Sequence, residues 1–274
     1  MKAKPMDENV GFDGLTHALK QDTADDNTIF GQINANWRQG RTAYGGVTTA
    51  LAYGAVQKCF DDLPPLRSMV ANFIGPVGEA PIFKPRLLRR GRNVVSIYVE
   101  CFSDDKLVAT TTFIFGAGRP SLVSQTLPAP QSSSPGDAEE FFPPEALSVL
   151  PQFFSNFDVK LVGGARPLAG DEGYMRVWAR HKDVPSRSDN VANFIALADL
   201  LPPAAMPLAR TFDPISSINW TLNFLVPPTT QDGWFEIETR MSAANEGYSS
   251  QIMRNWNSEG ILVAEGMQSV AIFF

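Results

Sequence analysis

The chain has 274 residues, enough for one large or two ordinary domains, and 44% of them are hydrophobic while 19% are charged. This composition is typical of a folded globular protein and excludes extended disorder. The net charge of -6 gives no general attraction to phosphate backbones or anionic lipid, so we expect no nucleic-acid partner and no membrane partner.

The N-terminal residues 1–14 include basic side chains but lack the apolar run of a signal peptide. No stretch has enough consecutive apolar residues to cross a bilayer. Cys59 and Cys101 lie far apart and match no metal-binding spacing, so both are interpreted as core residues. These features predict a cytoplasmic protein without a metal or other cofactor.

The first half of the chain predicts a strand, a helix, a second strand and a hairpin of two long strands, over residues 29–37, 44–60, 66–77 and 94–115. In the hairpin, alternation places every second residue from Val95 to Cys101 on one face, as in a sheet packed on one side. The helix begins with Gly45 and Gly46 and is rich in small residues, so its backbone can approach a sheet closely.

Residues 117–150 are rich in Pro and Ser and lack strand alternation, so we interpret them as a connector. Such polar segments make few packing contacts, and we expect shortening near Gln131–Gly136 to be tolerated.

The second half repeats the order of elements, with a strand, a helix, a strand and a closing antiparallel pair over residues 174–181, 189–201, 216–228 and 248–274. Local sequence supports the repeat, because VANFIGPV resembles WTLNFLVPP. The repeat predicts an α+β fold of two units, each a helix wrapped by a curved antiparallel sheet. The expected division is 1–116, connector 117–150 and 151–274.

This order of elements, with a Gly-Gly helix first, ALAD in the second helix and VAEGMQSV in the last strand, resembles acyl-CoA thioesterase II. The resemblance covers nearly the whole chain outside the connector through short motifs. It implies a double hotdog fold and hydrolysis of acyl-CoA to a carboxylic acid and coenzyme A by an activated water. It also implies a homo-oligomer, as a dimer of double hotdogs.

In that family an Asp, a Thr or Ser, and a Gln activate the water. The resemblance assigns these roles to Asp199 in IALADLLP, Ser217 in SSINW and Gln268 in EGMQSV. The closest family pattern has Thr where this chain has Ser, and the neighbouring Ser216 leaves the hydroxyl assignment open by one position.

Each of these side chains also has a structural interpretation. Asp199 follows the apolar run NFIALA, which places it at a buried position or cleft edge, or else in solvent at a Pro-terminated helix end. The amide of Gln268 can donate to a carboxylate and accept from water, or it can simply point to solvent. Ser217 can position a water or cap a turn, and without a G-x-S-x-G motif it is not expected to act as a nucleophile.

Two features are candidates for substrate binding. Backbone N–H groups at Gly45 and Gly46 can attract a carbonyl oxygen or a phosphate, although close helix packing needs the same glycines. Arg89 and Arg90 in RLLRRGR can meet the phosphates of coenzyme A, or they can form a solvated basic turn.

The two halves differ at the polar positions. Aligning the helices places Gly54 or Ala55 near Asp199, and aligning the last strands places Phe113 near Gln268. The first half therefore lacks the polar set. We expect one site in the chain, with the first half supplying a wall, scaffold or acyl tunnel.

Two other functions are compatible with a hotdog fold. Enoyl-CoA hydration uses an Asp and a His close together in sequence, and no such pair occurs, since His17 and His181 are both interpreted as solvated. A non-catalytic acyl-CoA or acyl-ligand binding protein would keep the cavity while the polar trio does not act. Release of free thiol from acyl-CoA separates this binder from the enzyme.

Overall fold

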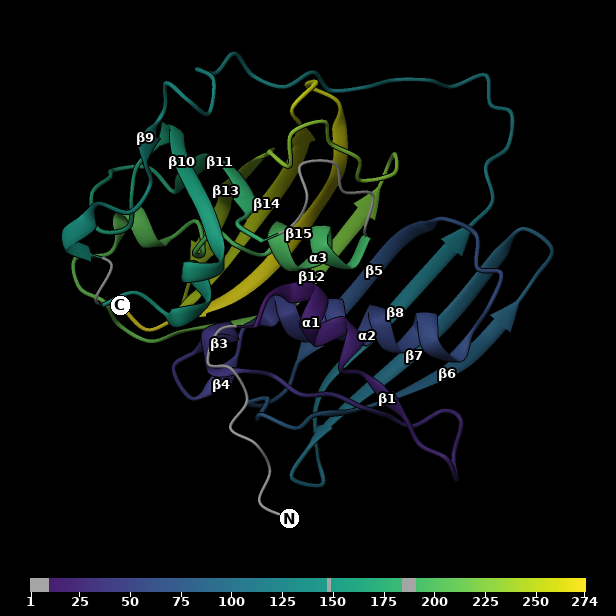
Figure 1. Ribbon diagram of the computed structural model, residues 1–274. Coiled ribbons are helices and arrows are strands. Elements are labelled where there is room, and N and C mark those ends of the chain that lie inside the picture. The colour runs from purple at the N-terminus through teal and green to yellow at the C-terminus, as the bar shows by residue number, and fades with distance from the viewer. Residues whose placement is uncertain (1–9, 147–148, 184–190) are drawn as a thin grey trace.

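The computed structural model describes residues 10–146, 149–183 and 191–274. Within these ranges thirteen strands form one antiparallel sheet, ordered β1-β2-β6-β7-β8-β5-β12-β15-β14-β13-β11-β10-β9 (Figure 1). The N-terminal strands are β1 (Lys20–Gln21), β2 (Ile29–Phe30), β5 (Leu66–Phe73), β6 (Ile82–Arg90), β7 (Val94–Ser103) and β8 (Lys106–Gly116). The C-terminal strands are β9 (Glu139–Glu140), β10 (Phe157–Gly164), β11 (Tyr174–His181), β12 (Ile215–Phe224), β13 (Phe235–Asn245), β14 (Tyr248–Asn257) and β15 (Leu262–Ile272).

The sheet consists of two copies of one arrangement that meet at β5 and β12. The order β2-β6-β7-β8-β5 in the first half corresponds to β11-β13-β14-β15-β12 in the second. The two halves join through an antiparallel register in which Thr221 lies opposite Val70. The predicted double unit is therefore confirmed, and the join brings one edge of each unit to the centre of the molecule.

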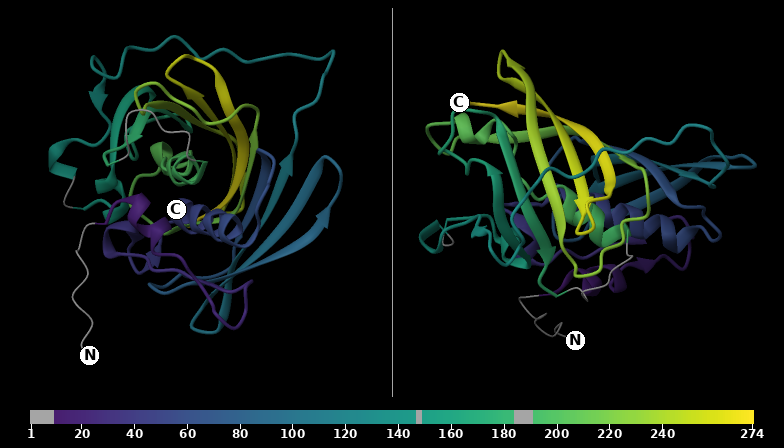
Figure 2. Two further views of the ribbon diagram at one scale, coloured as in Figure 1. Left: turned by 45° about the vertical axis from the view of Figure 1, so that its right-hand side comes forward. Right: turned by 90° about the horizontal axis from the view of Figure 1, so that it is seen from above.

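Each half wraps one main helix, α2 (Gly45–Cys59) or α3 (Val191–Ala198), inside the curve of the sheet (Figure 2). The two helices pack against each other, and the Tyr44 hydroxyl donates to the Ala196 carbonyl at 2.9 Å. The short helix α1 (Phe12–His17) lies near α2 in Figure 1. Leu19, which follows α1, lies close to Gly54 of α2. A Cβ on Gly54 would lie 2.8 Å from the Leu19 side chain, so the glycine permits this contact between the two segments.

The remaining elements are short. They are the hairpin β3 (Arg38–Gln39) and β4 (Thr42–Ala43), and the 3-10 helices η1 (Ala35–Trp37), η2 (Pro144–Ala146), η3 (Gln152–Asn156) and η4 (Met206–Leu208). The strand expected over 29–37 is wrong beyond Phe30, because the chain turns into η1. The expected helix 189–201 is described as Val191–Ala198, and residues 189–190 lie outside the described part.

His181 corrects a prediction, because it is buried rather than solvated. Its side chain is 6% exposed, its ring lies 4.8 Å from that of Phe157, and Nε2 is 2.8 Å from the Asn193 carbonyl oxygen. Burial lowers its pKa, so it is held neutral. His17, in contrast, is exposed as expected.

The connector crosses the molecule from the end of β8 to β9 (Figure 1). Residues 117–138 contain no helix or strand, yet they make several contacts with the outer face of the C-terminal sheet. Trp256 Nε1 donates to the Leu127 carbonyl at 3.0 Å, and Trp178 Nε1 donates to the Ser133 carbonyl at 2.9 Å. The expectation of few packing contacts near Gln131–Gly136 is therefore wrong.

Candidate active site

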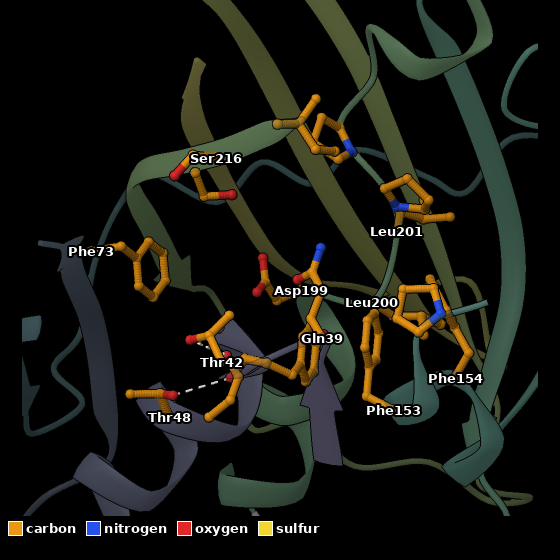
Figure 3. A pocket seen from close by; sticks show the side chains of 18 of the residues that line it. Gln39, Thr42, Thr48, Phe73, Phe153, Phe154, Asp199, Leu200, Leu201 and Ser216 are labelled. Carbon is orange, nitrogen blue, oxygen red and sulfur yellow. Dashed lines mark hydrogen bonds between the residues drawn. The ribbon is translucent and has the colours of Figure 1, made fainter. Parts of the chain in front are cut away.

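A cavity of about 600 Å³ opens where the two halves meet. Its wall combines the β3–β4 hairpin and the start of α2 with the chain after α3, the start of β12, and Gln268. Figure 3 shows Asp199 in the middle of this cavity, with Phe73 on one side and Phe153 on the other. Most lining side chains are apolar, and among the described lining residues the carboxylates are those of Asp199 and Asp213.

Asp199 lies in the turn that directly follows α3, which ends at Ala198. Gln268 Nε2 donates to its Oδ1 at 3.0 Å, and the backbone N–H of Gly46 donates to the same carboxylate. Burial raises the pKa of Asp199 from 3.8 to about 7, against the opposing effect of these two hydrogen bonds. A carboxyl group with this pKa can take up and release a proton near neutral pH.

Gln268 lies on β15 and is 3% exposed, facing α3 and the cavity rather than solvent. Its Oε1 accepts from Gln251 Nε2 at 2.9 Å. Gln251 is not among the site residues predicted from the sequence. A usable signal was present, because the closing hairpin places Gln251 of β14 directly opposite Gln268.

Ser217 and Ser216 both line the cavity, at the start of β12. Ser217 pairs with Val270, which lies on the same buried face of β15 as Gln268, and the register shifts at a bulge after Ser217. This register favours Ser217 over Ser216. Among the described residues Ser217 makes no direct hydrogen bond to Asp199, whose hydrogen-bond partners are Gln268 and Gly46.

Gly45 and Gly46 form the first turn of α2 and face Asp199 from the N-terminal half. The Gly46 N–H donates to the Asp199 carboxylate, as expected for an anion at the start of a helix. A Cβ on Gly45 would lie 2.8 Å from Asp199 Oδ2 and 3.2 Å from the Phe73 ring. The stacked rings of Tyr44 and Phe153, 4.1 Å apart, further fix this turn.

The Gly45→Ala variant tests this close approach. The added methyl would contact both Asp199 and Phe73, so the carboxylate or the helix must move. A misplacement of about 1 Å from the reacting position can cost about 10²-fold in rate, so we expect a loss of this order in kcat. Ala at Gly118, an exposed position outside the cavity lining whose Cβ would lie an ordinary 3.9 Å from Arg67, is the matched control. A measured kcat for Gly45→Ala equal to that of Gly118→Ala would contradict the arrangement.

Arg89 and Arg90 are not brought to this cavity. Both are exposed on β6, which is separated from the central β5 by β7 and β8. The Arg90 side chain lies 3.5 Å from the Asp61 carbonyl oxygen. The residues form the end of a strand rather than a turn.

The equivalent positions of the first half are apolar. Phe113 of β8 lies opposite Ile97 of β7, just as Gln268 lies opposite Gln251. The Phe113 ring packs edge-on against Tyr53 of α2 at 5.8 Å, where the second half has the Asp199–Gln268 hydrogen bond. The halves therefore differ as expected: at the same register the first half has apolar side chains where the second half has polar ones.

Solved structures define the class of fold. A protein of unknown function with a hot dog fold from Alicyclobacillus acidocaldarius aligns with a TM-score of 0.85 at 22% identity, covering 96% of this chain and 98% of that one. A putative thioesterase II from Thermobifida fusca gives 0.81 at 17%, covering 96% and 97%. Acyl-CoA thioesterase II TesB2 from Mycobacterium marinum gives 0.74 at 18%, covering 94% and 97%. The chain has the double hotdog fold.

Sequence families identify the group more closely. The acyl-CoA thioesterase N-terminal domain matches residues 33–116, and the acyl-CoA thioesterase C-terminal domain matches residues 128–272. The chain therefore belongs to the family that these two domains define. A comparison with curated protein sequences gave no match. No helix among the described residues has the length and apolar character to span a membrane.

Proposed function

We propose that this chain is an acyl-CoA thioesterase with one active site, in which Asp199 activates a water molecule. The observation that carries the proposal is the carboxyl group of Asp199, which lines the cavity between the halves and has a pKa raised to about 7. At neutral pH such a group is about half ionised, which suits a general base. The family to which the chain belongs supports the substrate class.

The proposed reaction has two steps. The Asp199 carboxylate takes a proton from water while the water oxygen attacks the thioester carbonyl carbon. The resulting tetrahedral intermediate then expels the coenzyme A thiolate, which receives the proton from Asp199. Gln268 and Ser217 orient the water, and most of the rate gain comes from placing it in line with the carbonyl.

The oxyanion needs donors other than those that hold Asp199. Gly46 gives its N–H to the carboxylate, so the remaining N–H groups in the first turn of α2 are the proposed donors. Gln268 carries a second N–H beside the cavity and can add to them. The acyl chain would lie against the apolar wall that includes Phe73, Phe153 and Leu201.

A hydratase reaction has less support at this site. Among the described residues no histidine lines the cavity, and His181 is buried against Phe157 instead. Phosphate binding by Arg89 and Arg90 stays a proposal, and it requires the nucleotide of coenzyme A to extend as far as β6. The dimer and the cytoplasmic location also stay predictions.

Release of free thiol from a panel of straight-chain acyl-CoAs tests the proposed function. We expect equal amounts of coenzyme A and carboxylic acid, with a chain-length preference because the cavity is finite. Folded protein that binds acyl-CoA but releases no thiol across the panel would show a non-catalytic binding protein. Gly118→Ala, outside the cavity lining, is the positive control for folded enzyme.

A further inference from the structure

Three hydrogen bonds form a continuous chain that ends on Asp199. The backbone N–H of Ala204 donates to Gln251 Oε1 at 2.6 Å, and Gln251 Nε2 donates to Gln268 Oε1 at 2.9 Å. Gln268 Nε2 then donates to Asp199 Oδ1 at 3.0 Å. Gln251 is 1% exposed and Gln268 is 3% exposed, so water does not compete for these bonds.

The direction of the chain is set by its first member. A backbone N–H can only donate, so the Gln251 atom facing Ala204 must be its carbonyl oxygen. The Gln251 amide nitrogen is then turned to Gln268, whose own oxygen must accept. This leaves the Gln268 nitrogen facing Asp199. A reversed Gln268 would place its oxygen against the carboxylate and would favour the protonated acid instead.

The chain of bonds also has no counterpart in the first half. Ile97 occupies the position of Gln251, and Phe113 occupies that of Gln268, and both are fully buried. An apolar pair therefore satisfies the fold at this register. Burying the amides of Gln251 and Gln268 in the second half costs free energy of desolvation, and packing alone would not require this.

From these observations we propose that Gln251 is a positioning residue, which locks the Gln268 amide with its nitrogen toward Asp199 and thereby keeps that carboxyl group ionisable as a base. This inference rests on the proposed function for its effect on turnover. Its effect on the carboxyl group can be measured without turnover. Gln251 itself is not among the residues that line the cavity, so it acts through Gln268.

The Gln251→Met variant keeps the length of the side chain and removes both polar atoms. The Gln268 oxygen then loses its donor, and its amide can rotate so that the carboxylate loses a hydrogen bond. We expect the midpoint of the Asp199 carboxyl titration, followed by 13C NMR, to rise by about one pH unit. The signal is assigned as the one that Asp199→Asn removes.

Kinetic constants give a second readout. We expect kcat at pH 7 to fall about fivefold to tenfold in Gln251→Met, because fewer molecules carry the ionised base, while KM stays within about twofold. Ser249→Ala is the matched control. It removes a buried polar atom from the next inward position of β14 and leaves the chain of bonds intact. Its midpoint and kcat should equal those of the wild type.

A second variant keeps the proposal testable if Gln251→Met does not fold. In Gln251→Glu the ionised side chain accepts from both Ala204 and Gln268, which reverses the Gln268 amide and should raise the Asp199 midpoint. An unchanged midpoint in either folded variant would overturn the proposal. If the wild type releases no thiol, the proposed function fails, and the NMR midpoint still decides the role of Gln251.

Discussion

Asp199→Asn is expected to lower kcat by about 10²–10⁴-fold, the usual loss for a positioned general base. The variant keeps the shape of the side chain and removes its ability to accept a proton from water. Because Gln268 and Gly46 hold this carboxylate beside the cavity, the loss should appear in kcat more than in KM. Steady-state kinetics on one acyl-CoA measure it.

The stability of the same variant should change in the opposite direction. The pKa of Asp199 is raised by burial from 3.8 to about 7, so the folded protein binds this proton more tightly than the unfolded chain. The resulting stabilisation is present below pH 3.8 and is lost as the pH rises through about 7. Asp199→Asn has no such loss, so its Tm should exceed that of the wild type above pH 7. A lower Tm with unchanged kcat would instead identify a structural aspartate.

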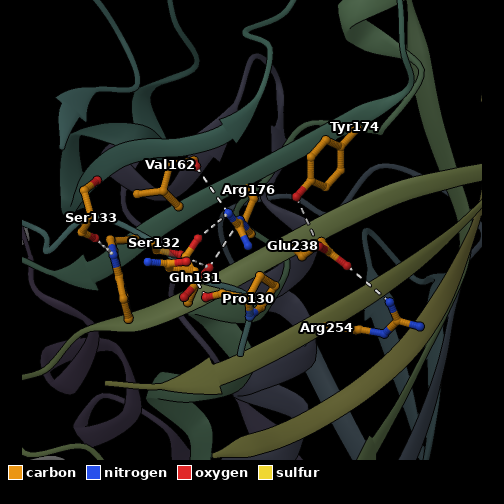
Figure 4. A network of polar contacts seen from close by, with 11 residues as sticks. Pro130, Gln131, Ser132, Ser133, Val162, Tyr174, Arg176, Glu238 and Arg254 are labelled. Carbon is orange, nitrogen blue, oxygen red and sulfur yellow. Dashed lines mark hydrogen bonds and ion pairs between the residues drawn. The ribbon is translucent and has the colours of Figure 1, made fainter. Parts of the chain in front are cut away.

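Arg176→Met is expected to lower the free energy of unfolding by about 3–5 kcal/mol at neutral pH. Arg176 Nε lies 3.2 Å from Glu236 Oε1, and these side chains are only 9% and 1% exposed. Figure 4 shows Arg176 and the connector residues Gln131 and Ser132 meeting on the outer face of the sheet. Removing the guanidinium leaves a buried carboxylate with Ser132 as its remaining donor, at 2.7 Å.

The pH dependence of this effect follows from Glu236. Burial raises its pKa, while Ser132 and Arg176 lower it, so loss of Arg176 raises it further. The destabilisation should therefore be smaller in acid, where Glu236 is protonated in both states. Denaturant titration at two pH values measures this.

Lys160→Met is the control, because Lys160 pairs with Glu140, which is 61% exposed, and such a pair contributes about 0–1 kcal/mol. Equal losses in the two variants would contradict the buried network. The kcat of Arg176→Met should be unchanged, since Arg176 lies outside the cavity lining.

The repeated architecture could be predicted because it depends on local pattern. The strand over 94–102 alternates clearly, and the helix that follows Tyr44 begins with two glycines. The strands β6, β10 and β13 were missed, and in β6 and β10 charged residues or glycines mask the alternation. His181 was misjudged for a related reason, since its neighbours Arg180 and Lys182 are charged while β11 turns His181 inward.

The candidate site was only partly predictable. Gln268 and Asp199 could be paired through family resemblance, and their hydrogen bond is present. The contact of Gly46 with Asp199 could not be foreseen, since it joins the two halves through a backbone atom. The contacts of the connector could not be predicted from its Pro- and Ser-rich composition. Its backbone carbonyls, not its side chains, accept the hydrogen bonds from Trp178 and Trp256.

The pH dependence of kcat/KM for one acyl-CoA tests the central claim most directly, because it reports the ionisation of the free enzyme. If Asp199 is the base, kcat/KM should rise with pH and reach half of its plateau near pH 7, the pKa set by its burial. The Gly118→Ala control, outside the cavity lining, should give the same curve. A curve that reaches its plateau by about pH 5, as an ordinary solvated carboxylate would give, would contradict the account.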